Sequence, residues 1–171
     1  MNKIISNRKR DDFVEKYAWA VPTKEAISEI ALFANGENIL EVGAGLGYWA
    51  MRLKKKNVNI IATDVGDNGW RHNKNKKHCE VLKMSHLEAI ETFQDAKVLF
   101  ICWPPFKNEM AAESIEQFRG NKLVYVGETK WGCCGTDRFF DNLYENWINS
   151  NNVYIPNFEI AHDQVSFWIR K

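Results

Sequence analysis

Short apolar runs alternate along the chain with segments whose apolar residues recur at helical spacing. The run KVLFICW, residues 97–103, is typical of a strand that is buried on both faces of a parallel sheet. The segments between such runs are typical of amphipathic helices that cover a sheet. The alternation therefore predicts an α/β fold with parallel strands and crossover helices.

Helices are predicted between the apolar runs. The first follows Thr23, a residue type that caps helix N-termini, and ends at Gly36. Another begins after Ser85, which forms a predicted capping box with Glu88 three residues later. Further helices are predicted over residues 48–55, 109–118 and 137–149.

The predicted strands fall into a parallel part and an antiparallel part. The first five alternate with the helices and cover residues 38–42, 58–64, 80–84, 97–103 and 121–128. The last two, residues 152–160 and 164–171, are separated by a short connection through His162 and Asp163, which is hairpin spacing. We therefore expect a three-layer α/β fold with a mostly parallel seven-stranded sheet and an antiparallel C-terminal hairpin.

Length and composition indicate one globular domain. The chain has 171 residues, of which 45% are hydrophobic and 26% charged, and this length suffices for one core but is short for two. We predict a single domain, with a lead-in of residues 1–22 and a core of residues 23–171. No apolar run approaches the roughly 18 residues that span a bilayer, and the charged start lacks the apolar stretch of a signal peptide. These features predict a cytoplasmic protein without a membrane partner.

The charge distribution gives little support for a polyanionic partner. The formal net charge is +1, so the overall field does not favour nucleic acid or an anionic membrane. One local exception is the basic segment WRHNKNKKH, residues 70–78, where stacking and phosphate contacts could recruit a nucleic acid. Charge runs of this kind are mostly solvated surface, and we favour that interpretation.

Four cysteines give no sign of a disulfide framework, because they are few and irregularly spaced. Reduced thiols are the expected state. Cys133 and Cys134 follow the fifth strand, where they could reach a ligand, but buried loop thiols are the simpler interpretation. No combination of cysteines and histidines has a recognised zinc spacing, so no metal site is expected.

Three glycines at alternate positions follow the first strand of the core, in the segment EVGAGLG at residues 41–47. A dinucleotide-binding turn would carry its third glycine at the position of Tyr48. A phosphate-binding loop would need a lysine and a hydroxyl after the last glycine, and neither is present. Glu41, two residues before the first glycine, suits a ligand with a cationic amine, which a pyrophosphate-binding turn does not need.

The segment EVGAGLG resembles the first motif of the class I S-adenosylmethionine-dependent methyltransferases. The resemblance implies their Rossmann-like fold, S-adenosylmethionine as cofactor and Glu41 as the residue that binds its amine. It also implies that Asp64, an acid at the end of the second strand, accepts hydrogen bonds from the ribose hydroxyls. The cofactor-binding residues predicted in this way are Glu41, Gly43, Ala44, Gly45, Gly47, Asp64, Val65, Ser85 and Trp19.

The third landmark of that family is an acid or polar residue after the third strand, near the adenine. In this chain Ser85, His86 or Leu87 stands there, which departs from the usual acid. Ser85 is the expected helix cap, and a cap could still reach the edge of the adenine. Which of the three contacts the adenine is left open.

The segment WPPF, residues 103–106, follows the fourth strand, where amino-methylating members of the class carry Asp, Asn or Ser, two prolines and an aromatic residue. In them the first residue accepts hydrogen bonds from the target amine. Trp103 cannot do so, because an indole is only a donor, so methylation of adenine in DNA is disfavoured. Structurally, the prolines could simply end a buried strand. The acceptor-site residues predicted from this turn and from the end of the fifth strand are Trp103, Pro104, Pro105, Phe106 and Glu128.

Upstream of the first core helix, the segment KYAWAVP at residues 16–22 carries two aromatic side chains, Tyr17 and Trp19. In many small methyltransferases an N-terminal segment closes the mouth of the cofactor site, and the resemblance implies that role here. Packing against the outside of the sheet is the alternative.

The functional prediction is an S-adenosylmethionine-dependent methyltransferase that acts on a nitrogen or oxygen acceptor. A small-molecule acceptor is favoured over a nucleic acid, and the oligomeric state is left open. Two alternatives remain: a protein that binds the cofactor without catalysis, for instance as a partner subunit, and an enzyme that degrades the cofactor.

Overall fold

The structure is a computed structural model, and it describes residues 4–6, 9–66, 77–159 and 161–171. The basic segment considered above as a nucleic-acid site lies largely outside the described residues, which resume at Lys77. None of the helices in the described ranges has the length and apolar character needed to cross a membrane.

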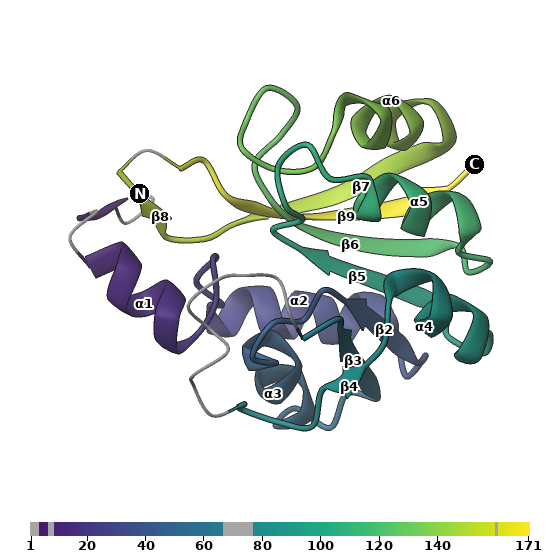
Figure 1. Cartoon of the computed structure of the whole chain (residues 1–171), viewed down its shortest axis with the longest axis horizontal. Coiled ribbons are helices and arrows are strands. Elements are labelled where there is room, and N and C mark those ends of the chain that lie inside the picture. Colours follow the sequence, from purple (N-terminus) through teal and green to yellow (C-terminus); the bar gives the residue numbers. More distant parts are fainter. Residues whose placement is uncertain (1–3, 7–8, 67–76, 160) are drawn as a thin grey trace.

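The described residues form a seven-stranded sheet with the order β4-β3-β2-β5-β6-β9-β7 (Figure 1). The strands from β4 to β6 are parallel, and β9 is antiparallel to both β6 and β7, as the sequence predicts. The bounds of the strands are Ile39–Val42 (β2), Ile60–Asp64 (β3), Leu82–Lys83 (β4), Val98–Cys102 (β5), Lys122–Gly127 (β6), Trp147–Tyr154 (β7) and Gln164–Arg170 (β9).

The strand order reverses between β2 and β5. From β2 the chain adds β3 and β4 on one side, and it then returns to add β5 and β6 on the other. In open α/β sheets, such a reversal leaves a crevice at the carboxyl ends of the two strands, and ligands bind there. The topology therefore predicts a ligand-binding site at the carboxyl ends of β2 and β5.

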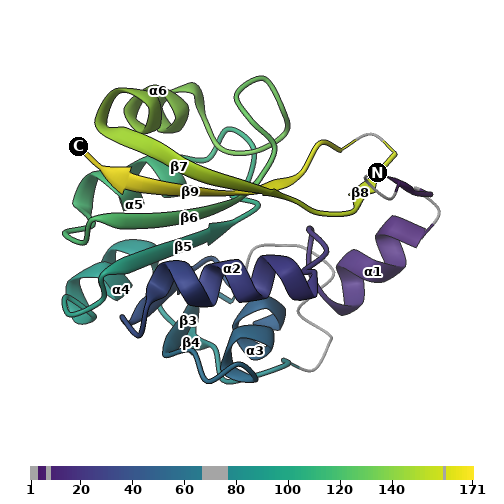
Figure 2. The ribbon, with the colours of Figure 1, turned by 180° about the vertical axis from the view of Figure 1, so that it is seen from behind.

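Helices cover both faces of the sheet (Figures 1 and 2), which gives the three predicted layers. Val98 and Phe100 of β5 pack in one apolar cluster with α2 and α3, whereas Leu99 and Ile101 pack in the other with α4, α5 and α6. This burial on both faces explains why β5 reads as a continuous apolar run. The helices are Arg10–Lys16 (α1), Lys24–Ala34 (α2), Tyr48–Lys54 (α3), His86–Thr92 (α4), Met110–Gln117 (α5) and Asp137–Asn146 (α6).

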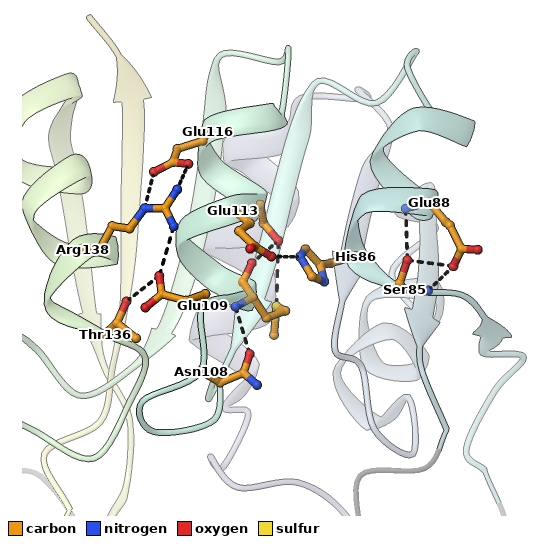
Figure 3. Close-up of polar contacts among 11 residues, drawn as sticks. Ser85, His86, Glu88, Asn108, Glu109, Glu113, Glu116, Thr136 and Arg138 are labelled. Carbon is orange, nitrogen blue, oxygen red and sulfur yellow. Dashed lines mark hydrogen bonds and ion pairs between the residues drawn. The ribbon is translucent and has the colours of Figure 1, made fainter.

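Both predicted helix caps are present. The Thr23 side chain accepts a hydrogen bond from the backbone N–H of Ala26 at 3.0 Å. Ser85 and Glu88 form the complete capping box at the start of α4 (Figure 3). Each cap satisfies backbone donors that the helix leaves unpaired.

The C-terminal part departs from the prediction in two places. Helix α6 ends at Asn146 instead of residue 149, because Trp147 is extended and buried and begins β7 by pairing with Arg170. The strand predicted over residues 152–160 stops at Tyr154, just before Ile155 and a proline that cannot donate to a ladder. The connection from β7 to β9 is therefore longer than a hairpin turn.

That connection contains a short strand whose residues were predicted as part of the strand over residues 152–160 but which forms separately. Asn157–Phe158 (β8) pairs in parallel with Ile4–Ile5 (β1) in a separate sheet. The Phe13 ring of α1 lies 5.9 Å from the ring of Phe158. At the C-terminal end of α1, the backbone carbonyl of Lys16 lies 2.6 Å from Nε2 of His78. These contacts attach the described part of the lead-in to two distant segments of the chain.

Candidate functional site

A cavity of about 720 Å³ lies at the carboxyl ends of the central strands, where the strand order reverses. Its size is in the usual range for a small-molecule or cofactor site. All predicted site residues except Gly47 and Glu128 line it. These lining residues are Trp19, Glu41, Gly43, Ala44, Gly45, Asp64, Val65, Ser85, Trp103, Pro104, Pro105 and Phe106.

The glycine turn after β2 forms one wall. Gly43, Gly45 and Gly47 all have left-handed backbone conformations, with φ of 69°, 55° and 72°, which explains three glycines at alternate positions. A Cβ at Gly47 would lie 2.7 Å from the Val81 side chain and 2.8 Å from that of Cys79, whereas one at Gly45 would meet open space. Gly47 therefore serves packing beneath the cavity, while the backbone at Gly45 is open to a ligand.

Glu41 is 1% exposed and lines the cavity from β2. Its Oε2 has no hydrogen-bond partner among the described residues. Burial, and to a lesser extent the nearby charge of Asp64, raise the pKa of this carboxyl to about 8. A ligand that brings a positive charge to this oxygen would stabilise the ionised carboxylate.

Asp64 is the last residue of β3, and its carboxylate links the glycine turn to the loop after β3 by hydrogen bonds. Its Oδ2 accepts a hydrogen bond from the backbone N–H of Gly45 at 2.9 Å, and its Oδ1 accepts one from that of Gly66 at 2.7 Å. Each carboxylate oxygen can accept a further hydrogen bond, so ribose hydroxyls remain compatible with these contacts. The role of Asp64 in holding the glycine turn had no signal in the sequence.

The segment after β4 contributes Ser85 and His86, but not Leu87, to the cavity wall. The Ser85 hydroxyl is engaged by the capping box and donates to Glu88 Oε2 at 2.7 Å. His86 Nε2 lies 2.8 Å from Oε2 of Glu113, a residue of α5 (Figure 3). This histidine–glutamate pair was missed by sequence reasoning, since its members come from different helices.

The WPPF turn after β5 presents Trp103 in a left-handed conformation, with φ of 50°. A bulky residue adopts this conformation only when its surroundings hold it there. The backbone N–H of Trp103 donates to the carbonyl of Val126 at 2.8 Å, and its indole Nε1 donates to Oδ1 of Asp163 at 2.7 Å. Asp163 is 1% exposed, and burial raises its pKa to about 7.

The lead-in lies at the cavity and not against the outside of the sheet. The Trp19 ring stacks on Trp103, with centroids 5.2 Å apart and planes 18° from parallel. The Arg10 guanidinium lies 5.1 Å from the centroid of Trp19 and 5.6 Å from that of Trp103. Arg10, Tyr17 and Trp19 all line the cavity. The N-terminal segment thus supplies one wall of the cavity.

Glu128 does not line the cavity. It is 6% exposed, and its carboxylate accepts hydrogen bonds from the backbone N–H groups of Cys133, at 2.6 Å, and His162, at 3.1 Å. These bonds fold the loop after β6 and tie it to the connection before β9. Glu128 therefore stabilises the loop, and its carboxylate is not placed on the cavity wall, where a catalytic base would have to lie.

The cysteines differ in their surroundings. Cys133 is exposed and lines the cavity, whereas Cys134 is buried, which raises the pKa of its thiol to about 12. Among the described residues, no group of three or more histidine, cysteine or acidic side chains is arranged to hold a metal ion.

Comparison with known proteins finds similarity in structure but not in sequence. No protein-family model matches the chain, and no curated protein matches its sequence. Among solved structures, magnesium protoporphyrin IX methyltransferase from Synechocystis PCC 6803, with bound S-adenosylhomocysteine, superposes with a TM-score of 0.57 at 10% identity. The match covers 86% of this chain and 82% of that one.

A second solved structure gives the same picture. The N-methyltransferase NodS from Bradyrhizobium japonicum WM9, in complex with S-adenosylhomocysteine, superposes with a TM-score of 0.57 at 15% identity, over 86% of each chain. The chain has the Rossmann-like fold of class I S-adenosylmethionine-dependent methyltransferases. At these identities the likeness concerns the fold alone, and the residues that line the cavity carry the information about its chemistry.

Proposed function

We propose that the protein is an S-adenosylmethionine-dependent methyltransferase that acts on a nitrogen or oxygen acceptor. The observation that carries the proposal is the unpaired, buried carboxylate oxygen of Glu41, in the same cavity wall as Asp64 and the glycine turn. Ionising a buried carboxyl whose Oε2 lacks a partner is costly, and a cationic ligand offsets that cost. The methyltransferase fold and its cofactor-bound neighbours support this interpretation.

The cavity residues fit the groups of S-adenosylmethionine. Glu41 would accept hydrogen bonds from the ammonium group, and Asp64 from the ribose hydroxyls. The left-handed turn would bring the backbone at Gly43 and Gly45 against the ligand without interference from a Cβ. Val65, Trp19 and the Ser85–His86 segment would complete the contacts. When bound, the cofactor supplies an electrophilic methyl group on its sulfonium.

On the acceptor side, the chain would act mainly by positioning. Proximity and orientation can supply roughly 7 to 11 kcal/mol of a barrier, so a strong base is not required. The Pro104 and Pro105 carbonyls already accept hydrogen bonds from Gly135 at 3.1 Å and Asn108 at 3.2 Å, which stiffens the turn. We favour a small-molecule acceptor, in a single-domain cytoplasmic protein, as part of the same proposal.

Calorimetric titration with S-adenosylmethionine and S-adenosylhomocysteine tests the cofactor assignment. The wild type should bind both, and Asp64→Ala should weaken both by at least about tenfold, the effect of losing one charged hydrogen bond. Asp95→Ala, at an exposed aspartate that does not line the cavity, is the matched control. Absence of binding to the folded wild type would refute the proposal.

The stacked pair of Trp19 and Trp103 favours one second candidate. If this pair closes the acceptor side, the protein would degrade the cofactor without transferring its methyl group. Incubation with S-adenosylmethionine alone separates these functions. Loss of the cofactor without an added acceptor indicates degradation, and methylation in an acceptor screen indicates transfer.

A further inference from the structure

Arg10 is the feature of the cavity that the proposed function leaves unexplained. It is the first residue of α1 and reaches the cavity wall. Among the described residues that line the cavity, it is the sole lysine or arginine. A guanidinium carries five donors and no acceptor, and its planar fork suits a carboxylate.

The surroundings of Arg10 orient its guanidinium plane but leave its Nε without an acceptor. The stacked indoles of Trp19 and Trp103 hold the guanidinium by cation–π contact. Its Nε is buried without a hydrogen-bond partner among the described residues. A buried donor in this state costs free energy that an anionic ligand would recover.

Asp163 is an acidic residue that interacts electrostatically with Arg10, and it does not take the place of a ligand. Its Oδ1 accepts the Trp103 indole N–H, and it does not line the cavity. No ion pair joins it to Arg10 within the described ranges. Its charge and that of the guanidinium attract each other through space.

Two side chains of opposite charge, each with one buried and unpaired polar atom, therefore line the same cavity. Glu41 offers a buried carboxylate oxygen, and Arg10 offers a buried guanidinium N–H. A ligand with both an ammonium and a carboxylate would satisfy both, and an α-amino acid group is such a ligand. Ordinary packing of an arginine on two rings explains the cation–π contacts but not the unsatisfied donor.

We infer that Arg10, oriented by Trp19 and Trp103, forms a carboxylate-binding subsite in this cavity. The inference rests on the proposed function. The carboxylate has two chemical sources: the amino-acid end of the cofactor, or a carboxylate on the methyl acceptor. In either case the N-terminal helix takes part in ligand recognition.

Calorimetric titration of the full chain with two ligands tests the first source. S-adenosylhomocysteine carries the amino-acid group, and 5′-methylthioadenosine lacks it. Arg10→Met should bind the former about tenfold to a hundredfold more weakly and the latter unchanged. Arg10→Lys should lose less, because it keeps the charge but not the fork. Arg119→Met, at an exposed arginine outside the cavity, should match the wild type for both.

Decarboxylated S-adenosylmethionine isolates the carboxylate itself. The wild type should bind it more weakly than S-adenosylmethionine by the same factor that Arg10→Met loses. The variant should then show no further loss with the decarboxylated compound, since the interacting pair is already broken. Equal losses of S-adenosylhomocysteine and 5′-methylthioadenosine in Arg10→Met would instead indicate packing alone and overturn the inference.

Benzoate titrated into protein saturated with S-adenosylhomocysteine tests the second source. If Arg10→Met binds the cofactor normally but loses benzoate binding that the wild type shows, the carboxylate belongs to the acceptor. If Arg10→Met changes the affinity for neither S-adenosylhomocysteine nor benzoate, the subsite does not exist. A wild type that binds neither S-adenosylhomocysteine nor 5′-methylthioadenosine would refute the proposed cofactor instead.

Discussion

The two walls of the cavity are built in different ways. The wall formed by Glu41, the glycine turn and Asp64 comes from β2, β3 and the loops directly after them. The wall formed by Arg10, Trp19 and Trp103 depends on α1, on the turn after β5 and on Asp163 close to β9. The first wall is local in sequence and made of backbone and carboxylates. The second is assembled by tertiary contacts and made of aromatic rings and one cation.

This difference teaches that the first wall is specified by residues close in sequence and the second by tertiary packing. A motif can be recognised when its residues are adjacent, because local backbone geometry requires particular residue types there. An aromatic wall has no such requirement, and many sequences can build it. Substitutions should therefore affect the two walls differently.

The largest effect is expected at Gly47, which supports the first wall from below. Gly47→Ala combines a left-handed backbone with close contacts to Val81 and Cys79 and should lower the free energy of unfolding by about 3 kcal/mol. Gly45→Ala has the same backbone cost without the contacts, and about 1 kcal/mol is expected. Urea unfolding of both variants measures the difference. Equal losses would mean that packing beneath the turn is unimportant.

A smaller effect is expected at Trp103 in the second wall. Trp103→Phe removes the donor to Asp163 and leaves a buried carboxylate with neither oxygen paired. We expect a loss of about 2 kcal/mol in the free energy of unfolding. In an Asp163→Asn background the same substitution should cost less, which a double-mutant cycle measures. Additive losses would show that the bond contributes no coupling.

The smallest effect concerns protons at Glu41. Because its folded-state pKa of about 8 lies above the unfolded value of 4.5, the free protein holds this proton at neutral pH. Between pH 4.5 and about 8, the unfolded chain ionises this carboxyl while the folded protein keeps its proton, so the free energy of unfolding falls as pH rises through this range. A cationic ligand favours the ionised form, so binding between about pH 6 and 7 should release a proton.

Ionising Glu41 in the folded protein at pH 7 costs about 1.4 kcal/mol, because its pKa lies about one unit above that pH. Titration of S-adenosylmethionine in two buffers of different ionisation enthalpy measures the proton release. Glu41→Gln should abolish it, while Arg10→Met should keep it even though it binds more weakly. Proton release that survives in Glu41→Gln would place the titrating group elsewhere.

The fold was predicted well where periodicity and caps agree, and less well where tertiary pairing decides. Thr23 and Ser85 cap helices as expected, because capping depends on neighbours a few residues away. Trp147 was assigned to a helix but begins a strand, since pairing with Arg170 overrides local propensity. The pairing of β1 with β8 joins the N-terminal segment to the connection between β7 and β9, and it leaves no local signal in the sequence.

The candidate site follows the same division. Gly43, Gly45 and Asp64, which were assigned to the cofactor site from the resemblance to the methyltransferase motif, line the cavity, and their roles toward a ligand stay predictions. Glu128 was chosen for its place at the end of a strand, but the backbone N–H groups that turn its carboxylate inward come from loops whose course depends on the folded chain. Arg10 could not be found from sequence, because its position depends on where α1 packs.

The stacking of Trp19 on Trp103 has a practical consequence. Two indoles in close, nearly parallel contact couple their electronic transitions, which gives a circular dichroism signal that neither ring produces alone. Any molecule that separates the rings on entering the cavity would change this signal. The protein thus carries its own optical reporter of occupancy, readable without a label or a known product.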